Sequence, residues 1–173
     1  MVQILKLTLT AMITAATALT SSFVYIPAGF VKIFPLQHLA NVLASVMLGP
    51  FYAVAQAFIV SVLRNMAGTG SVFAFPGSMI GAFAAAILYR QTRSIGLAAV
   101  GEIIGTGIIG AIACYPIAVL FLGQKVTLFG FIPAFIFSSF TGAAMAFMIL
   151  KIFLKNRYLE GFIYEKSINN RRL

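Results

Sequence analysis

Six apolar segments follow one another along this chain, and only a few polar or turn-forming residues separate each from the next. A helix needs about 20 mostly apolar residues to cross roughly 30 Å of hydrocarbon, so the pattern is typical of a membrane protein. With 61% hydrophobic and 9% charged residues and a mean hydropathy of +1.04, the composition excludes a water-soluble globular domain. A length of 173 residues accommodates six short-looped spans and no extramembrane domain.

We therefore predict an all-α integral membrane protein, a bundle of six transmembrane helices. The first apolar segment follows Lys6 closely, as in a signal peptide, but it is too long for a signal core, and its removal would leave an odd number of spans. Gly49 and Pro50 predict a tight turn between the second and third spans, because glycine can end a helix and proline cannot continue one. Pro76 suits the first turn of the fourth span. The predicted spans cover residues 4–25, 36–49, 51–67, 76–90, 95–122 and 128–154, giving a six-helix domain at 1–155 and a basic tail at 156–173.

The distribution of Lys and Arg predicts the orientation, because short cytoplasmic loops collect these residues. Nine of the 12 lie on the side of the chain termini and three on the other side, so we expect both termini in the cytoplasm. The formal net charge of +9 therefore reflects topology, and we do not expect nucleic-acid binding. The nine are Lys6, Arg90, Arg93, Lys151, Lys155, Arg157, Lys166, Arg171 and Arg172, and the three are Lys32, Arg64 and Lys125.

Strongly polar side chains within the predicted spans are functional candidates, because hydrocarbon tolerates few of them. His38 and Asn41 are three residues apart and share one face of the second span. Two roles stay open for Glu102 in the fifth span: a structural partner for Arg64 or His38, or a direct contact with a substrate. His38 and Arg64 could instead extend to water at the membrane interface. The candidate set is Gln37, His38, Asn41, Arg64, Asn65 and Glu102.

Aromatic residues gather at the outer loops, around the same polar set. Phe and Tyr at a membrane interface often form an aromatic belt or pack within loops, and that interpretation stays open here. Their position beside polar residues favours a pocket that binds a small, flat, mostly uncharged heterocycle. The cluster comprises Tyr25, Phe30, Phe34, Phe73 and Phe75.

Catalytic, metal-binding and nucleotide-binding motifs are absent from the sequence. The segment 105–110 matches G-x-G-x-x-G, but it lies inside an apolar span, and we interpret its glycines as helix-packing positions. An intramembrane enzyme using His38 and Glu102 has no second histidine, aspartate, H-E-x-x-H or G-x-S-x-G to support it. Cys114 is the only cysteine, so neither a disulfide nor a thiolate metal cluster is available. We predict a protein that is not an enzyme and holds no cofactor or metal.

Small residues recur four positions apart on three of the spans. This spacing lets helices approach closely in a membrane, within one bundle or against another protein. We expect internal packing for most of these residues and a partner contact for Ala11 and Ala15, which lie near the cytoplasmic end of the first span. The three sets are Ala11 and Ala15; Gly77, Gly81 and Ala85; and Ser138, Gly142 and Ala146.

A series of short motifs connects the loops to the polar spans. These are Ile26-Pro27-Ala28-Gly29, Lys32-Ile33-Phe34-Pro35-Leu36-Gln37-His38, Asn41-Val42, Leu48-Gly49-Pro50-Phe51-Tyr52-Ala53, Arg64-Asn65, Gly68-Thr69-Gly70, Ala74-Phe75-Pro76-Gly77-Ser78, Gly101-Glu102 and Ile104-Gly105-Thr106-Gly107. In this series the chain resembles the ThiW-type substrate-binding S components of energy-coupling factor (ECF) vitamin transporters. The resemblance covers nearly the whole chain and is weakest in the sixth span and the tail.

The resemblance implies a multi-pass protein of the prokaryotic plasma membrane that captures a thiamin precursor, the thiazole alcohol hydroxyethylthiazole, from outside. Its implied partners are a transmembrane coupling subunit, which Ala11 and Ala15 would contact, and two ATPase subunits. The loops at 30–35 and 68–75 would cover the ligand. Alternatives are the thiazole phosphate, intact thiamin, another small vitamin, or a stand-alone channel or facilitator. The predicted substrate-binding residues are Phe34, Gln37, His38, Asn41, Arg64, Asn65, Thr69, Phe73, Phe75, Glu102 and Thr106.

Overall fold

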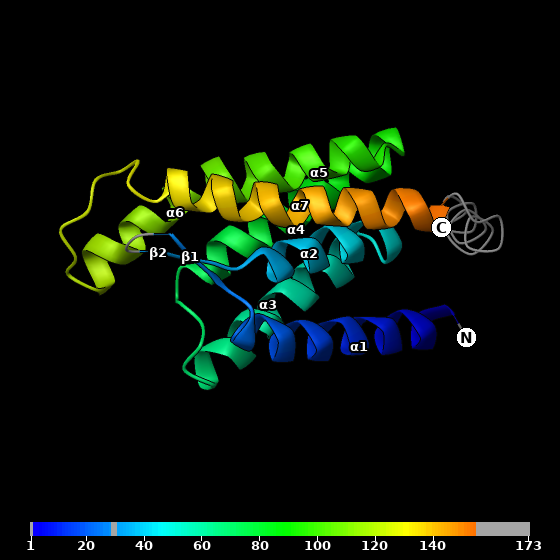
Figure 1. Cartoon of the computed structure of the whole chain (residues 1–173), viewed down its shortest axis with the longest axis horizontal. Coiled ribbons are helices and arrows are strands. Elements are labelled where there is room, and N and C mark those ends of the chain that lie inside the picture. The colour runs from blue at the N-terminus through cyan, green and yellow to red at the C-terminus, as the bar shows by residue number, and fades with distance from the viewer. Residues whose placement is uncertain (1, 29–30, 155–173) are drawn as a thin grey trace.

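Six helical rods form a bundle in the computed structural model, which describes residues 2–28 and 31–154 (Figure 1). The prediction of six helices is confirmed. The predicted basic tail at 156–173 and Phe30 lie outside the described residues. The rods are α1 (Val2–Phe23), α2 (Pro35–Met47), α3 (Pro50–Met66), α4 (Ala74–Thr92), a fifth rod made of α5 (Ile95–Ile104), η1 (Gly105–Gly110), α6 (Ala111–Pro116) and η2 (Ile117–Phe121), and α7 (Ile132–Leu154).

Three helices of the described chain are long and apolar enough to cross a membrane: Gln3–Phe23, Ile95–Phe121 and Ile132–Phe153. Helices α2 and α3 are shorter, with 13 and 17 residues. Helix α2 contacts α1, α3, α4, α5 and α7, so it forms the centre of the bundle, and it carries the buried polar side chains Gln37, His38 and Asn41 of the site.

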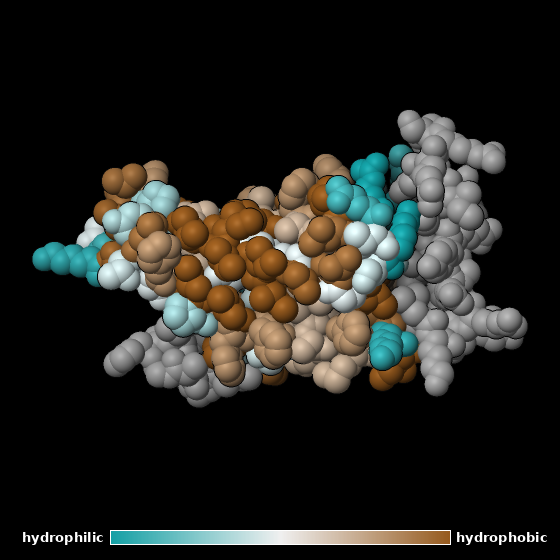
Figure 2. Space-filling view, turned by 90° about the horizontal axis from the view of Figure 1, so that it is seen from above, coloured by the Kyte–Doolittle hydropathy of each residue, from teal (hydrophilic) through white to brown (hydrophobic). Residues whose placement is uncertain are grey.

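The outer surface is apolar around the middle of the bundle. Figure 2 shows hydrophobic side chains across the middle of one face and hydrophilic ones toward its two ends. Large apolar side chains near the middle of their helices stay exposed, such as Phe83 at 53%, Ile109 at 51% and Phe140 at 59%. A soluble protein rarely exposes apolar area on this scale, whereas lipid tails accept it.

The two ends of the bundle differ, and α1 begins at the end where α7 finishes, as an even number of spans requires. Helix α1 begins and α7 ends at one end, where the α2–α3 and α4–α5 turns also lie (Figure 1). The first of these turns is the predicted one: Gly49 has a φ of +89°, and Pro50 occupies the first turn of α3. The hairpin strands β1 and β2 and the loops at 67–73 and 122–131 gather at the other end.

Three local features differ from the predictions. Residues expected as loop form a short antiparallel hairpin of β1 (Ile26–Ala28) and β2 (Val31–Ile33), and β2 packs on α7. The sixth helix begins at Ile132 instead of residue 128, after a loop in which Gly123 has a φ of +60°. The fifth rod contains two π-helical segments, η1 and η2, a widened geometry that often occurs at functional sites.

Glycines allow α4 and the fifth rod to pack backbone to backbone. A Cβ placed on Gly105 would lie 2.9 Å from Gly81 Cα, and one on Gly110 would lie 2.6 Å from Gly77 Cα. On α7, a Cβ on Gly142 would lie 2.2 Å from the carbonyl oxygen of Pro35. The G-x-G-x-x-G segment and the small-residue spacing are therefore packing features, as predicted.

Candidate ligand-binding site

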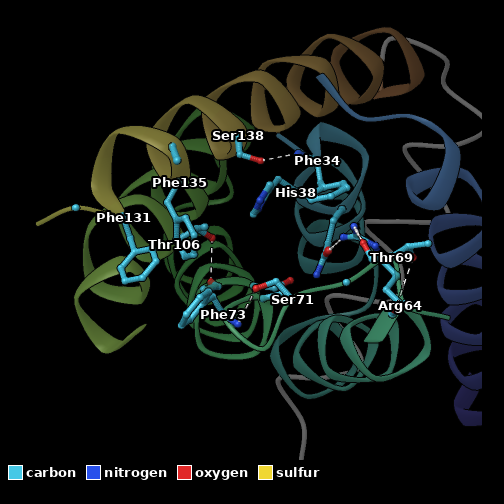
Figure 3. Close-up of a pocket in the computed structure, with 18 residues that line it drawn as sticks. Phe34, His38, Arg64, Thr69, Ser71, Phe73, Thr106, Phe131, Phe135 and Ser138 are labelled. Atoms are coloured by element: carbon cyan, nitrogen blue, oxygen red, sulfur yellow. Dashed lines mark hydrogen bonds between the residues drawn. The ribbon is translucent and has the colours of Figure 1, made fainter. Parts of the chain in front are cut away.

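A cavity of about 380 Å³ lies among α2, α3, α4, η1 and α7, at the end of the bundle where β1, β2 and the loops at 67–73 and 122–131 gather (Figures 1 and 3). This volume falls at the lower end of the range of small-molecule pockets, about 300–1,000 Å³. The lining residues are Phe34, Gln37, His38, Arg64, Gly68, Thr69, Gly70, Ser71, Phe73, Ala74, Gly77, Ser78, Thr106, Gly130, Phe131, Ala134, Phe135 and Ser138.

Glu102 is fully buried behind the cavity wall and organises the polar residues of three helices. Its Oε1 accepts hydrogen bonds from His38 Nδ1 at 2.8 Å, from Asn41 Nδ2 at 2.9 Å and from Thr106 Oγ1 at 3.1 Å. Asn41 also donates to Ser78 Oγ at 2.9 Å, which joins α2 to α4. Of the two structural partners open to Glu102, the structure shows His38, and not Arg64.

Arg64 holds the cavity loops together. Its Nη2 donates to the carbonyl oxygen of Thr69 at 2.9 Å, and its Nη1 donates to Gln37 Oε1. The guanidinium carbon lies 3.9 Å from the centre of the Phe34 ring, a close cation–π contact. Arg64 is only 2% exposed, so it does not extend to water.

Aromatic rings from the ends of two loops and from the first turn of α7 form the opposite wall. The rings of Phe73 and Phe131 lie 4.7 Å apart, and those of Phe131 and Phe135 lie 6.1 Å apart. Ser138 Oγ accepts a hydrogen bond from the backbone N–H of Phe34 at 3.1 Å, which ties α7 to the segment before α2. Figure 3 shows His38 between this wall and Phe34, with its ring turned toward the cavity. The cavity thus combines flat apolar surfaces with a few fixed polar groups.

The predicted binding residues separate into two groups. Seven of them line the cavity, namely Phe34, Gln37, His38, Arg64, Thr69, Phe73 and Thr106. Four do not: Asn41 and Glu102 lie behind the wall, Asn65 donates to the Ser61 and Ser71 carbonyls, and Phe75 packs edge-to-face on Phe58.

A family model described as "Thiamine-precursor transporter protein (ThiW)" matches residues 7–156. The chain belongs to the ThiW family. It is therefore a multi-pass membrane transport protein and not an enzyme, as the sequence predicted. A solved structure, described as the S component of a bacterial ECF transporter, is similar in fold, with a TM-score of 0.71 and 20% sequence identity over 89% of this chain and 97% of that one. No curated protein sequence matches the chain.

The sequence predictions missed the contribution of α7 and the loop before it to this ThiW-family cavity. Gly130, Phe131, Ala134, Phe135 and Ser138 line it, although the sixth span offered no distinctive motif. Ala134 and Ser138 are four positions apart, as are Phe131 and Phe135, and this spacing places each pair on one face of a helix. The spacing is the signal that could have indicated them.

The two alanines predicted to meet a partner lie on the outside of this ThiW-family protein. Ala11 and Ala15 are exposed on α1, whereas Thr10, Thr14 and Thr17 of the same helix are buried toward the bundle. Helix α1 packs on α2 and α3, so its alanine face points away from the cavity and leaves both residues accessible.

Proposed function

We propose that this ThiW-family protein is the substrate-capture subunit, or S component, of an ECF importer, and that its ligand is hydroxyethylthiazole taken from outside the cell. The observation that carries the proposal is the cavity between the aromatic wall and His38. A thiazole alcohol has a flat ring that Phe73, Phe131 and Phe135 can contact, and a polar arm that fixed polar groups can bind.

The place of the cavity supports capture from outside. The cavity lies at the end of the bundle that is farther from the first residues of α1 and the last residues of α7. The distribution of Lys and Arg predicts that this end faces outward. Phe34 and the 68–73 loop line the cavity and contact each other through Arg64, so they are placed to cover a bound ligand. Covering the ligand would exclude water and strengthen each hydrogen bond to it.

Delivery across the membrane would need partner subunits. The chain has no nucleotide-binding motif, and we propose a transmembrane coupling subunit and two ATPase subunits as partners, with Ala11 and Ala15 at the contact. Small residues on a lipid-facing surface permit close approach of another helix, and both alanines are exposed.

A stand-alone channel would require an open polar path through the bundle. On the far side of the Glu102 cluster, the described interior is instead filled by buried apolar residues of α2, α4, α5 and α7, including Val42, Val46, Tyr89 and Leu150. This packing favours a binding protein over a channel.

Calorimetric titration of the purified, detergent-solubilised protein tests the proposal. We expect saturable binding of hydroxyethylthiazole with one site per chain, and weaker binding of intact thiamin. Absence of hydroxyethylthiazole binding would reject the ligand assignment. Uptake into vesicles by the protein alone, without coupling and ATPase subunits, would reject the S-component assignment.

A further inference from the structure

The hydrogen bonds around Glu102 fix which ring nitrogen of His38 carries a hydrogen. Asn41 Nδ2 donates to Glu102 Oε1 at 2.9 Å, so this oxygen is an acceptor, and the single hydroxyl hydrogen of Thr106 is shared between it and the Gly77 carbonyl. His38 Nδ1 lies 2.8 Å from the same atom and must therefore be the protonated nitrogen. In the neutral ring, Nε2 is consequently an acceptor with a free lone pair.

That lone pair belongs to a residue that lines the cavity. Among the described residues, His38 Nε2 has no hydrogen-bond partner, and the ring is turned toward the cavity (Figure 3). The imidazole nitrogen that carries no hydrogen can accept a hydrogen bond but cannot donate one. A ligand hydroxyl can satisfy it, whereas an ether oxygen or a phosphate oxygen without hydrogen cannot.

The cation of the cavity is not presented to a ligand. Arg64 is the only Lys or Arg among the residues that line it, and its two terminal nitrogens bind Gln37 Oε1 and the Thr69 carbonyl. Its Nε is buried without a partner in the described chain, and Phe34 covers one face of the guanidinium. The lining residues therefore offer a phosphate neither an exposed cation nor a pair of free N–H donors.

We propose that the cavity selects an uncharged ligand whose hydroxyl group donates to His38 Nε2. This inference rests on the proposed function and deepens it: the free thiazole alcohol is the ligand, and its phosphate ester is rejected. His38 is the specificity-determining residue, and Glu102 is a positioning residue that acts through the tautomer of His38.

The test compares four compounds on the unchanged protein by calorimetry: hydroxyethylthiazole, its O-methyl ether, the deoxy analogue with an ethyl side chain, and the phosphate ester. We expect the ether and the deoxy analogue to bind at least about tenfold more weakly, because each covers His38 Nε2 without pairing it. The phosphate ester should bind at least about 100-fold more weakly, because its charge is left unpaired. An ether that binds as tightly as the alcohol, or a phosphate that binds more tightly, overturns the inference while the thiazole assignment stands. Absence of binding by all four rejects the proposed function and this inference with it.

Variants of Glu102 test the positioning role through the ratio of alcohol to ether affinity. Glu102→Gln keeps an oxygen acceptor for His38, Asn41 and Thr106, so the preference for the alcohol should persist. Glu102→Met removes the acceptor, so His38 can adopt either tautomer. The ratio of alcohol affinity to ether affinity should then fall toward one. Gln56→Leu serves as the control, because Gln56 is buried on α3 and does not line the cavity. An unchanged ratio in Glu102→Met, with the control at the parent value, would contradict the positioning role.

Discussion

Gly81 of α4 and Thr106 of η1 are so close that a Cβ on Gly81 would lie 2.0 Å from Thr106 Oγ1 and 2.8 Å from Glu102 Oε2. The absence of a side chain at position 81 therefore allows Glu102, and through it His38, to reach its place behind the cavity. Helix packing and the polar cluster depend on the same residue.

Gly81→Ala is expected to destabilise the protein and to weaken ligand binding by about tenfold or more, because the methyl group displaces Thr106 and the Glu102 carboxylate. Thermal unfolding and calorimetry measure the two effects. Gly96→Ala is the matched control, since its Cβ would meet only ordinary contacts at 3.7 and 3.9 Å and alanine favours a helix. Equal melting temperatures for the two variants would contradict the packing account.

Arg64→Lys is expected to weaken binding by about tenfold, because an ammonium cannot hold Gln37 and Thr69 together while stacking on Phe34. Protease cleavage within residues 67–73 should become faster at the same time, since the carbonyl of Thr69 loses its donor. The exposed Arg90 provides the control, and Arg90→Lys should change neither the rate of protease cleavage nor the affinity for the ligand. Unchanged cleavage in Arg64→Lys would show that the guanidinium does not hold the loop.

Ala134→Phe is expected to abolish ligand binding while the protein stays folded. Ala134 lines the cavity from α7, and a phenyl ring there would occupy space that the ligand needs. Calorimetry measures the loss, and the melting temperature reports the fold. Retention of full affinity by a folded Ala134→Phe would place the ligand elsewhere.

Ala15→Phe should give the opposite result, with ligand affinity unchanged and ATP-dependent uptake by the assembled transporter lost. The side chain at position 15 is exposed on α1 and would hold a partner helix away. Ile109→Phe, at another exposed position with 51% exposure, should transport normally. If Ala15→Phe lost binding itself, α1 would belong to the ligand site and not to the coupling surface.

The helices could be predicted from the sequence because apolar length and turn residues act locally. Gly49 and Pro50 end and begin helices by their own backbone preferences, so the turn between α2 and α3 was predicted correctly. The β1–β2 hairpin and the π-helical segments depend on tertiary contacts, such as Gly110 against Gly77, and local sequence does not report these.

The polar residues of the site could be predicted from the sequence, whereas its aromatic residues could be predicted only in part. A buried carboxylate needs a partner, so Glu102 could be linked to His38 or Arg64, but only the fold decides between them. Phe135 belongs to the apolar helix α7 and Phe131 lies just before it. Their spacing of four positions indicates a shared face but does not say whether that face meets the cavity or lipid.

The most direct test of the account is calorimetric titration of hydroxyethylthiazole into the purified protein and into Ala134→Phe in parallel. The account predicts saturable binding with one site per chain in the parent protein and no measurable binding in the folded variant. Absence of binding to the parent, or equal binding to both, would contradict the claim that this cavity holds the thiamin precursor.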